Sequence, residues 1–151
     1  MQWRRKFNSF LSQSALTQGL LLPAWLLTAL ARALVLIVPF KRFAPYLGRH
    51  SGVAPFLPLA SPSQQQTALA IGRAIRMAAQ FTPWEANCQA QAISARCFLG
   101  LFSVPYAVFY GVAHAPEQAM KAHAWVCTGP VQVTGGYAFD EFTVVAVFAR
   151  P

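Results

Sequence analysis

The chain has 151 residues, of which 56% are hydrophobic and only 11% charged, and its formal net charge is +8. A chain of this length forms one domain that buries roughly two-thirds of its unfolded surface. Nine Lys and Arg residues and no acid precede Trp84, whereas three bases and four acids follow from there. Such a cationic half predicts contact with anionic lipid, an acidic peptide or nucleic acid, but no basic–aromatic motif supports nucleic acid.

The cysteine content argues against a secreted disulfide scaffold and against a metal site. Cys88, Cys97 and Cys127 are odd in number, and with the three histidines they form no CxxC or HxxxH pair. We therefore expect no metal, no cofactor and a reducing, cytoplasmic setting.

The N-terminus imitates a targeting signal, because "MQWRRKF" precedes the apolar run "GLLLPAWLLTALARALVLIVPF". Arg32 interrupts that run, at a cost of roughly 3 kcal/mol on an insertion scale. The apolar segments on either side are shorter than the roughly 20 residues of a membrane span. We expect a helix over 9–38, with Pro23 as a candidate break, that is buried or faces a partner. A membrane anchor over 16–40 stays open.

The remaining elements run from helices to strands. The segment 39–62 is a proline-rich, irregular connector, and Ser61 followed by Pro62 predicts the start of a helix that runs to about residue 80. A second helix begins at Thr82, with Glu85 completing a capping box, or at Asn87, and ends near Leu99. Four strands are expected, over 104–113, 122–128, 131–135 and 142–149.

Helices followed by closely spaced strands predict an α+β fold, in which N-terminal helices precede an antiparallel sheet. Within one compact domain, we separate a basic and apolar helical region with its connector (1–61) from a catalytic core (62–151).

One cysteine lies where the backbone favours chemistry. Cys88 falls in the first turns of the second helix, where free N–H groups and the helix dipole stabilise a thiolate and an oxyanion. His123 lies on a strand of the sheet that would pack against this helix, and is the candidate base. The plain alternative is a small buried cysteine and a satisfied core histidine. Cys127 shares a strand face with His123 and Trp125, but at about 13 Å from His123 it is too distant to pair with it.

Several segments together resemble a known family. "PWEANCQAQA" fits a Pro-Trp-x-x-x-Cys pattern that opens a helix of small residues, "LFSVPYAVFYGV" resembles the strand that follows, and "AHAWV" is the strongest match. The upstream "LTALARALVLIVPFKRFAPYLGR" resembles the N-terminal helix of the same family. In this order, over nearly the whole chain, they resemble the stand-alone leader peptidases of lasso-peptide biosynthesis, which are transglutaminase-like cysteine proteases.

The resemblance implies a papain-like reaction. Cys88 would attack the peptide carbonyl at the end of a precursor's leader, its backbone N–H would help to hold the oxyanion, and His123 would transfer the proton. Trp84 and Trp125 would line the substrate site. The implied partners are the precursor's leader peptide, a separate leader-recognition protein and a lasso cyclase of the asparagine-synthetase type. The enzyme would be cytoplasmic, with a peripheral membrane contact left open.

The sequence departs from the family at the third member of the triad. The family's aspartate falls about a dozen residues beyond the histidine, where this chain reads "VTGG" (133–136). Asp140 could orient His123 if the chain folds back, or could merely cap the last strand. Thr134 or a backbone carbonyl would also serve. Two further functions stay open: transfer of the acyl group to an amine, and a non-catalytic membrane-associated scaffold.

Overall fold

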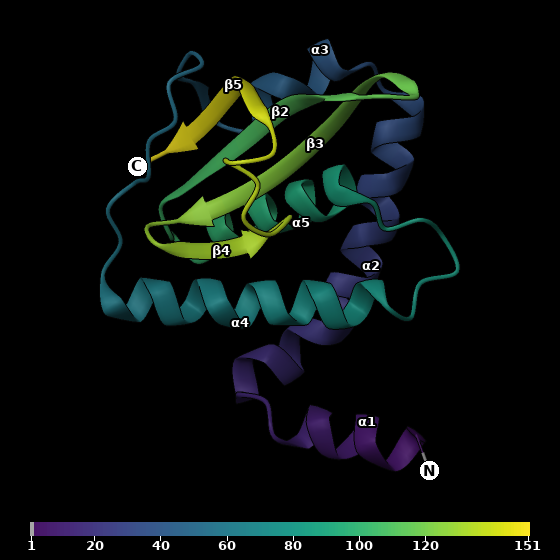
Figure 1. Cartoon of the computed structure of the whole chain (residues 1–151). Coiled ribbons are helices and arrows are strands. Elements are labelled where there is room, and N and C mark those ends of the chain that lie inside the picture. Colours follow the sequence, from purple (N-terminus) through teal and green to yellow (C-terminus); the bar gives the residue numbers. More distant parts are fainter. Residues whose placement is uncertain (1) are drawn as a thin grey trace.

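The computed structural model of the chain describes residues 2–151, apart from the side chains of residues 115, 118 and 119. Helices come first and strands last (Figure 1). The elements in chain order are α1 (Gln2–Leu11), α2 (Ala15–Ile37), α3 (Phe40–Phe43), the 3-10 helix η1 (Ala44–Tyr46), β1 (Arg49–His50), α4 (Pro62–Ala79), α5 (Cys88–Leu101), β2 (Tyr106–Ala115), β3 (Gln118–Thr128), β4 (Val131–Thr134) and β5 (Thr143–Arg150). The fold is α+β, as the sequence predicts.

The strands form one antiparallel sheet in the order β1-β5-β2-β3-β4, with two differently covered faces. The helices α2, α4 and α5 cover one face and build the main core with it. The loop between β4 and β5 crosses the other face, where Ala138 and Phe142 join a smaller apolar cluster. Figure 1 shows that loop in front of the sheet and α5 behind it.

The predicted long N-terminal helix is two helices, α1 and α2, which are separated at residues 12–14. Ser14 caps α2 by accepting a hydrogen bond from the Thr17 backbone N–H at 3.2 Å. The candidate break at Pro23 is wrong, since α2 runs through it. Pro23 lies on the exposed side of the helix, and so does Gly19, whose carbonyl loses its partner four residues later and meets solvent there.

The two later helices begin at local caps. Ser61 and Gln64 form a capping box, with each side chain accepting from the other residue's backbone N–H, and Pro62 occupies the first turn of α4. Asn87 caps α5 by accepting from the Ala90 N–H at 3.0 Å. The alternative start at Thr82 is wrong, because its hydroxyl donates to backbone carbonyls instead.

The connector is more ordered than its proline content suggests. It holds α3, η1 and the short strand β1, which pairs with β5 at the edge of the sheet. Its longest stretch without a helix or strand is 51–61. The buried Tyr106 hydroxyl ties this region to the core by donating to the Leu47 carbonyl at 2.8 Å.

The helix α4 approaches the sheet closely because it carries a glycine at the crossing. A Cβ on Gly72 would lie 2.5 Å from the carbonyl oxygen of Val133 on β4. That carbonyl accepts a hydrogen bond from the Arg76 guanidinium at 2.7 Å. Burial, and secondarily Arg73, lowers the pKa of Arg76. The spacing between α4 and the sheet is therefore set by direct contact between the backbones of Gly72 and Val133.

Candidate active site

The structure places Cys88 at the first residue of α5, directly after the Asn87 cap. The N–H groups of the first helical turn surround this position, and the positive end of the helix dipole can stabilise an oxyanion there. The Cys88 side chain is half-buried and packs against the core between the helices and the sheet. Its expected position at a helix start is therefore confirmed.

Two aromatic residues lie close to this helix start. Tyr110 on β2 points to the helix side of the sheet, and burial raises its pKa, which the neighbouring Gln89 only partly offsets. Its hydroxyl makes no well-aligned hydrogen bond to any described residue. Trp84 packs on Trp25 of α2, with ring centroids 4.6 Å apart, and its buried indole N–H likewise has no partner within residues 2–151. Sequence reasoning missed Tyr110, which no motif marks.

His123 lies on the other face of the sheet. Side chains alternate along a strand, and its ring stacks against Trp125 and Phe142, with centroids 5.9 and 4.9 Å away. Both of those residues belong to the cluster under the β4–β5 loop. The neighbouring Ala124 instead faces the helices. Trp125 thus flanks His123 as expected, in a fully buried position.

The structure therefore does not bring the Cys88 thiol and the His123 imidazole together. The sheet lies between them, because α5 packs on one face and His123 projects from the other. Sequence alternation correctly groups His123, Trp125 and Cys127 on one face, but it does not reveal which face meets the helices.

A backbone carbonyl lies where the resemblance to leader peptidases implies an acid. The His123 Nε2 lies 2.8 Å from the carbonyl oxygen of Gly135, so that nitrogen carries the proton and donates it. Gly135 follows His123 by twelve residues, where the family has its aspartate. Asp140 is exposed in the β4–β5 loop and makes no hydrogen bond to His123. The Thr134 hydroxyl is buried without a partner among the described side chains.

The remaining candidates hold structural positions. Cys127 is buried in the cluster with Trp125, and burial raises the pKa of its thiol to about 12. Cys97 is half-buried on α5, against the main core. Among the described residues, no three His, Cys, Asp or Glu side chains gather as a metal site would require.

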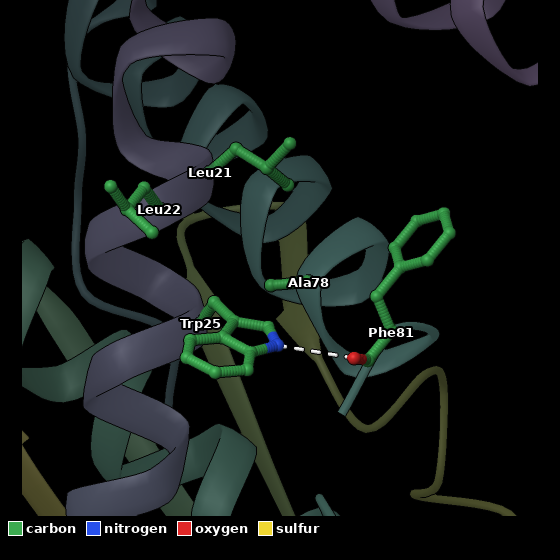
Figure 2. Close-up of a pocket in the computed structure, with 5 residues that line it drawn as sticks. All are labelled: Leu21, Leu22, Trp25, Ala78 and Phe81. Atoms are coloured by element: carbon green, nitrogen blue, oxygen red, sulfur yellow. Dashed lines mark hydrogen bonds between the residues drawn. The ribbon is translucent and has the colours of Figure 1, made fainter. Parts of the chain in front are cut away.

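An apolar pocket opens between α2 and the end of α4. Figure 2 shows Trp25 on its wall, with the indole N–H donating to the Phe81 carbonyl at 3.1 Å. The pocket measures about 360 Å³ and is lined by Leu21, Leu22, Trp25, Ala78 and Phe81. A more polar hollow of about 270 Å³ lies between α1 and α4, beside Arg73 and Arg76. Neither one includes Cys88 or His123.

Comparison with known proteins supplies the family. The profile of the transglutaminase-like superfamily matches residues 34–147, which is well over half of the chain and includes both α5 and β3. The chain belongs to the transglutaminase-like superfamily. Searches among curated proteins and solved structures returned no match. This superfamily includes cysteine peptidases and acyltransferases, so the transglutaminase-like domain agrees with a nucleophilic role for a cysteine at a helix start.

One helix of this transglutaminase-like protein, Ala15–Ile37, is long and apolar enough to cross a membrane by length and composition. Only 22% of its most apolar window is buried inside the domain. Of the two expectations for this helix, burial or contact with a partner, burial therefore holds only for the face that packs on the domain.

Proposed function

We propose that this chain is a cysteine peptidase that removes the leader from a ribosomally made lasso-peptide precursor. The observation that carries the proposal is the position of Cys88 at the capped N-terminus of α5, within a transglutaminase-like domain. The Pro83–Cys88 motif and the Ala122–Val126 motif add the likeness to leader peptidases. A separate leader-recognition protein would present the substrate, and a cyclase of the asparagine-synthetase type would use the freed amine.

The chemistry follows from the position of Cys88. Its sulfur would attack the scissile carbonyl, form a C–S bond and place negative charge on the carbonyl oxygen, which N–H groups of the first turn of α5 would stabilise. The histidine would take the thiol proton and pass it to the leaving amine as the C–N bond breaks. Water would then resolve the thioester and regenerate the thiol.

This chemistry requires His123 to reach the helix side of the sheet. The pairing of β2 with β3 is irregular near the hairpin: Ala113 pairs with Lys121, but Ala115 pairs with Gln118, one residue out of register. If that irregularity moved along β3 to a point just beyond His123, His123 would lie opposite Tyr110 instead of Gly111. A one-residue shift turns a side chain to the opposite face of a sheet. His123 would then project beside Tyr110 and Cys88.

The first part of β3 is suited to such a shift, because it has one neighbour only. The β4 strand pairs with β3 from Val126 to Thr128, so the segment 118–125 pairs with β2 alone. Segments with few backbone partners open at low free-energy cost. The Gly135 carbonyl is the polar contact that holds the His123 ring in its present position. We propose that binding of the leader and its recognition protein favours the shifted pairing.

The deciding experiment is cleavage of a candidate precursor in the presence of its recognition protein. Cys88→Ala and His123→Ala should each lower the rate by a factor of 10³ or more, on the order of the loss for a nucleophile–base pair. Cys97→Ala on the same helix and His114→Ala on β2 are matched controls that should cleave like the wild type. Full activity of Cys88→Ala would end the proposal.

A crosslink tests the shift itself. In a chain with Cys97→Ser and Cys127→Ser, the His123→Cys change should give a disulfide with Cys88 when leader and recognition protein are present. The free chain should form it much more slowly, since the two positions face opposite sides of the sheet. Equal crosslinking in both conditions would show that no change of face accompanies binding.

The orientation of His123 favours one other candidate function, a non-catalytic protein with a transglutaminase-like fold. In that case neither Cys88→Ala nor His123→Ala would affect precursor processing. Transfer of the acyl group to an amine is the third candidate, because the superfamily includes acyltransferases. Trapping the Cys88 acyl intermediate and asking whether water or an added amine resolves it separates the two reactions.

A further inference from the structure

The helix α2 has two apolar faces, of which only one is packed. The packed face lies against α4 and α5 and consists of Thr17, Leu20, Ala24, Thr28 and Ala31. The opposite side is an exposed apolar stripe, which we define as Leu22, Leu26, Leu30, Ala33 and Ile37. Leu30 is 67% exposed and Ile37 is 79% exposed. The stripe runs for most of a helix about 34 Å long, far beyond the scattered exposed leucines of an ordinary soluble surface.

The helix α1 also has an exposed apolar stripe. Trp3, Phe7 and Leu11 recur at helical spacing, and no residue of α1 is buried. Trp3 is 87% exposed. Figure 1 shows α1 on the far side of α4 from the sheet. A helix with bulky apolar residues on one side and Arg and Lys on the other is the kind that lies in a membrane interface.

Positive charge lies at both ends of the α2 stripe. Arg4 and Arg5 on α1 precede it, and Lys41 and Arg42 on α3 follow it, all exposed. The only charged residue within α2, Arg32, is paired with Glu85 at 3.1 Å and lies off the stripe. No acidic residue occurs before Glu85 in the sequence. An apolar strip between two cationic ends matches the apolar interior and anionic headgroups of a lipid surface.

We propose that α1 and the exposed stripe of α2 dock the protein on an anionic membrane surface, with both helices lying along the interface. The charge complementarity favours lipid over a second copy of this chain, whose matching face would carry the same positive charge. The docking is peripheral, because α2 is tied into the domain by its packed face. Thr17 donates to the Ala70 carbonyl at 3.3 Å and Trp25 donates to the Phe81 carbonyl at 3.1 Å. Spanning a bilayer would break these contacts and expose the core.

The test is sedimentation of the full chain with vesicles of phosphatidylcholine alone or with 30 mol% phosphatidylglycerol. We expect binding to the anionic vesicles, at least about tenfold weaker binding to the neutral ones, and a loss of binding as salt is raised. The Leu22→Glu/Leu26→Glu variant should bind the anionic vesicles at least about tenfold more weakly than the wild type. The matched control is Leu59→Glu/Leu101→Glu, which makes the same change of charge at exposed leucines outside α1 and α2. Its affinity for the anionic vesicles should lie within about twofold of that of the wild type.

A fluorescence measurement locates the contact. Trp3 emission should shift to the blue on anionic vesicles and be quenched by brominated lipid, and Trp3→Phe should remove that shift. Equal loss of binding in both double-glutamate variants would overturn the proposal, as would retention of the wild type in carbonate-washed membranes, which would indicate a spanning helix. Failure to bind vesicles, together with dimers that Leu22→Glu/Leu26→Glu disrupts, would assign the stripe to a second copy. None of these outcomes depends on peptidase activity.

Discussion

Gly135 decides how His123 is held. Its backbone has φ of +81°, and a Cβ at this position would lie 2.5 Å from the Cβ of Trp125. The chain therefore passes close enough to β3 for the Gly135 carbonyl to reach the His123 imidazole. The same geometry explains why no acid stands at this position, because an aspartate would collide with Trp125.

Restoring the family's acid at this position should harm the fold. Gly135→Asp combines a strained positive φ with a steric clash, and we expect a loss of about 3 kcal/mol in the free energy of unfolding. Gly136→Asp is the matched control, since its φ is +68° but a Cβ there meets nothing within 4 Å. Strain alone should cost it about 1 kcal/mol. Urea denaturation compares the two, and equal losses would contradict the clash.

The Cys127 thiol should be inert in the folded protein. Burial raises its pKa to about 12, so at pH 8 it is protonated as well as shielded. Iodoacetamide at pH 8 should label the half-buried cysteines, Cys88 first, and label Cys127 only in urea. Mass spectrometry of digested protein measures this, and labelling of Cys127 at the rate of Cys88 would contradict it.

The raised pKa of Cys127 also makes the stability of the fold depend on pH. An unfolded thiol ionises near pH 9, whereas the folded one keeps its proton to about pH 12. The folded state thus binds more protons between these values, and the contribution of Cys127 to stability falls as the pH rises through that window.

At the scale of elements, α5 begins where Asn87 sets it. Asn87→Ala removes the side-chain acceptor of the Ala90 N–H and should lower the free energy of unfolding by about 1 kcal/mol. Ser61→Ala removes the corresponding cap of α4 and should cost a similar amount, without touching the cysteine. Cleavage activity separates them: the loss of the Asn87 cap should also lower the rate, and equal activity would contradict a role for the helix start.

Local sequence signals predicted the starts of the helices and the later strands, whereas tertiary packing determined which face of each strand meets the helices. The caps at Ser61 and Asn87 and the period of β2 to β5 are readable because each depends on neighbours in sequence. The face of β3 that meets α5 cannot be read from the sequence, because both faces carry apolar residues. Ala124 and Val126 lie on one face, and Trp125 and Cys127 lie on the other. Alternation fixes which side chains go together, and only tertiary packing chooses the side. The sequence therefore predicted the position of Cys88 at a helix start, but not the face of the sheet on which His123 lies.

At the scale of the whole molecule, the N-terminal half packs into the same core as residues 62–151. Buried residues of α2 and α3 share one apolar cluster with α4, α5 and the sheet. The β1 strand pairs with β5, so the edge of the sheet joins segments about a hundred residues apart. The family match, which begins at residue 34, agrees with a core that reaches into the first half of the chain.

Because α2 packs on helices that come later in the chain, it has no packing partners early in synthesis. The helix α2 leaves the ribosome well before α4 and α5, which later cover its packed face, so in the nascent chain both of its apolar faces are uncovered. In that interval the 23 residues of α2 are uncovered, and they are long and apolar enough to cross a membrane. Slower elongation after α2 would lengthen the exposure, whereas rapid synthesis of residues 62–101 would favour the folded domain. The order of synthesis thus determines how long α2 stays without its packing partners.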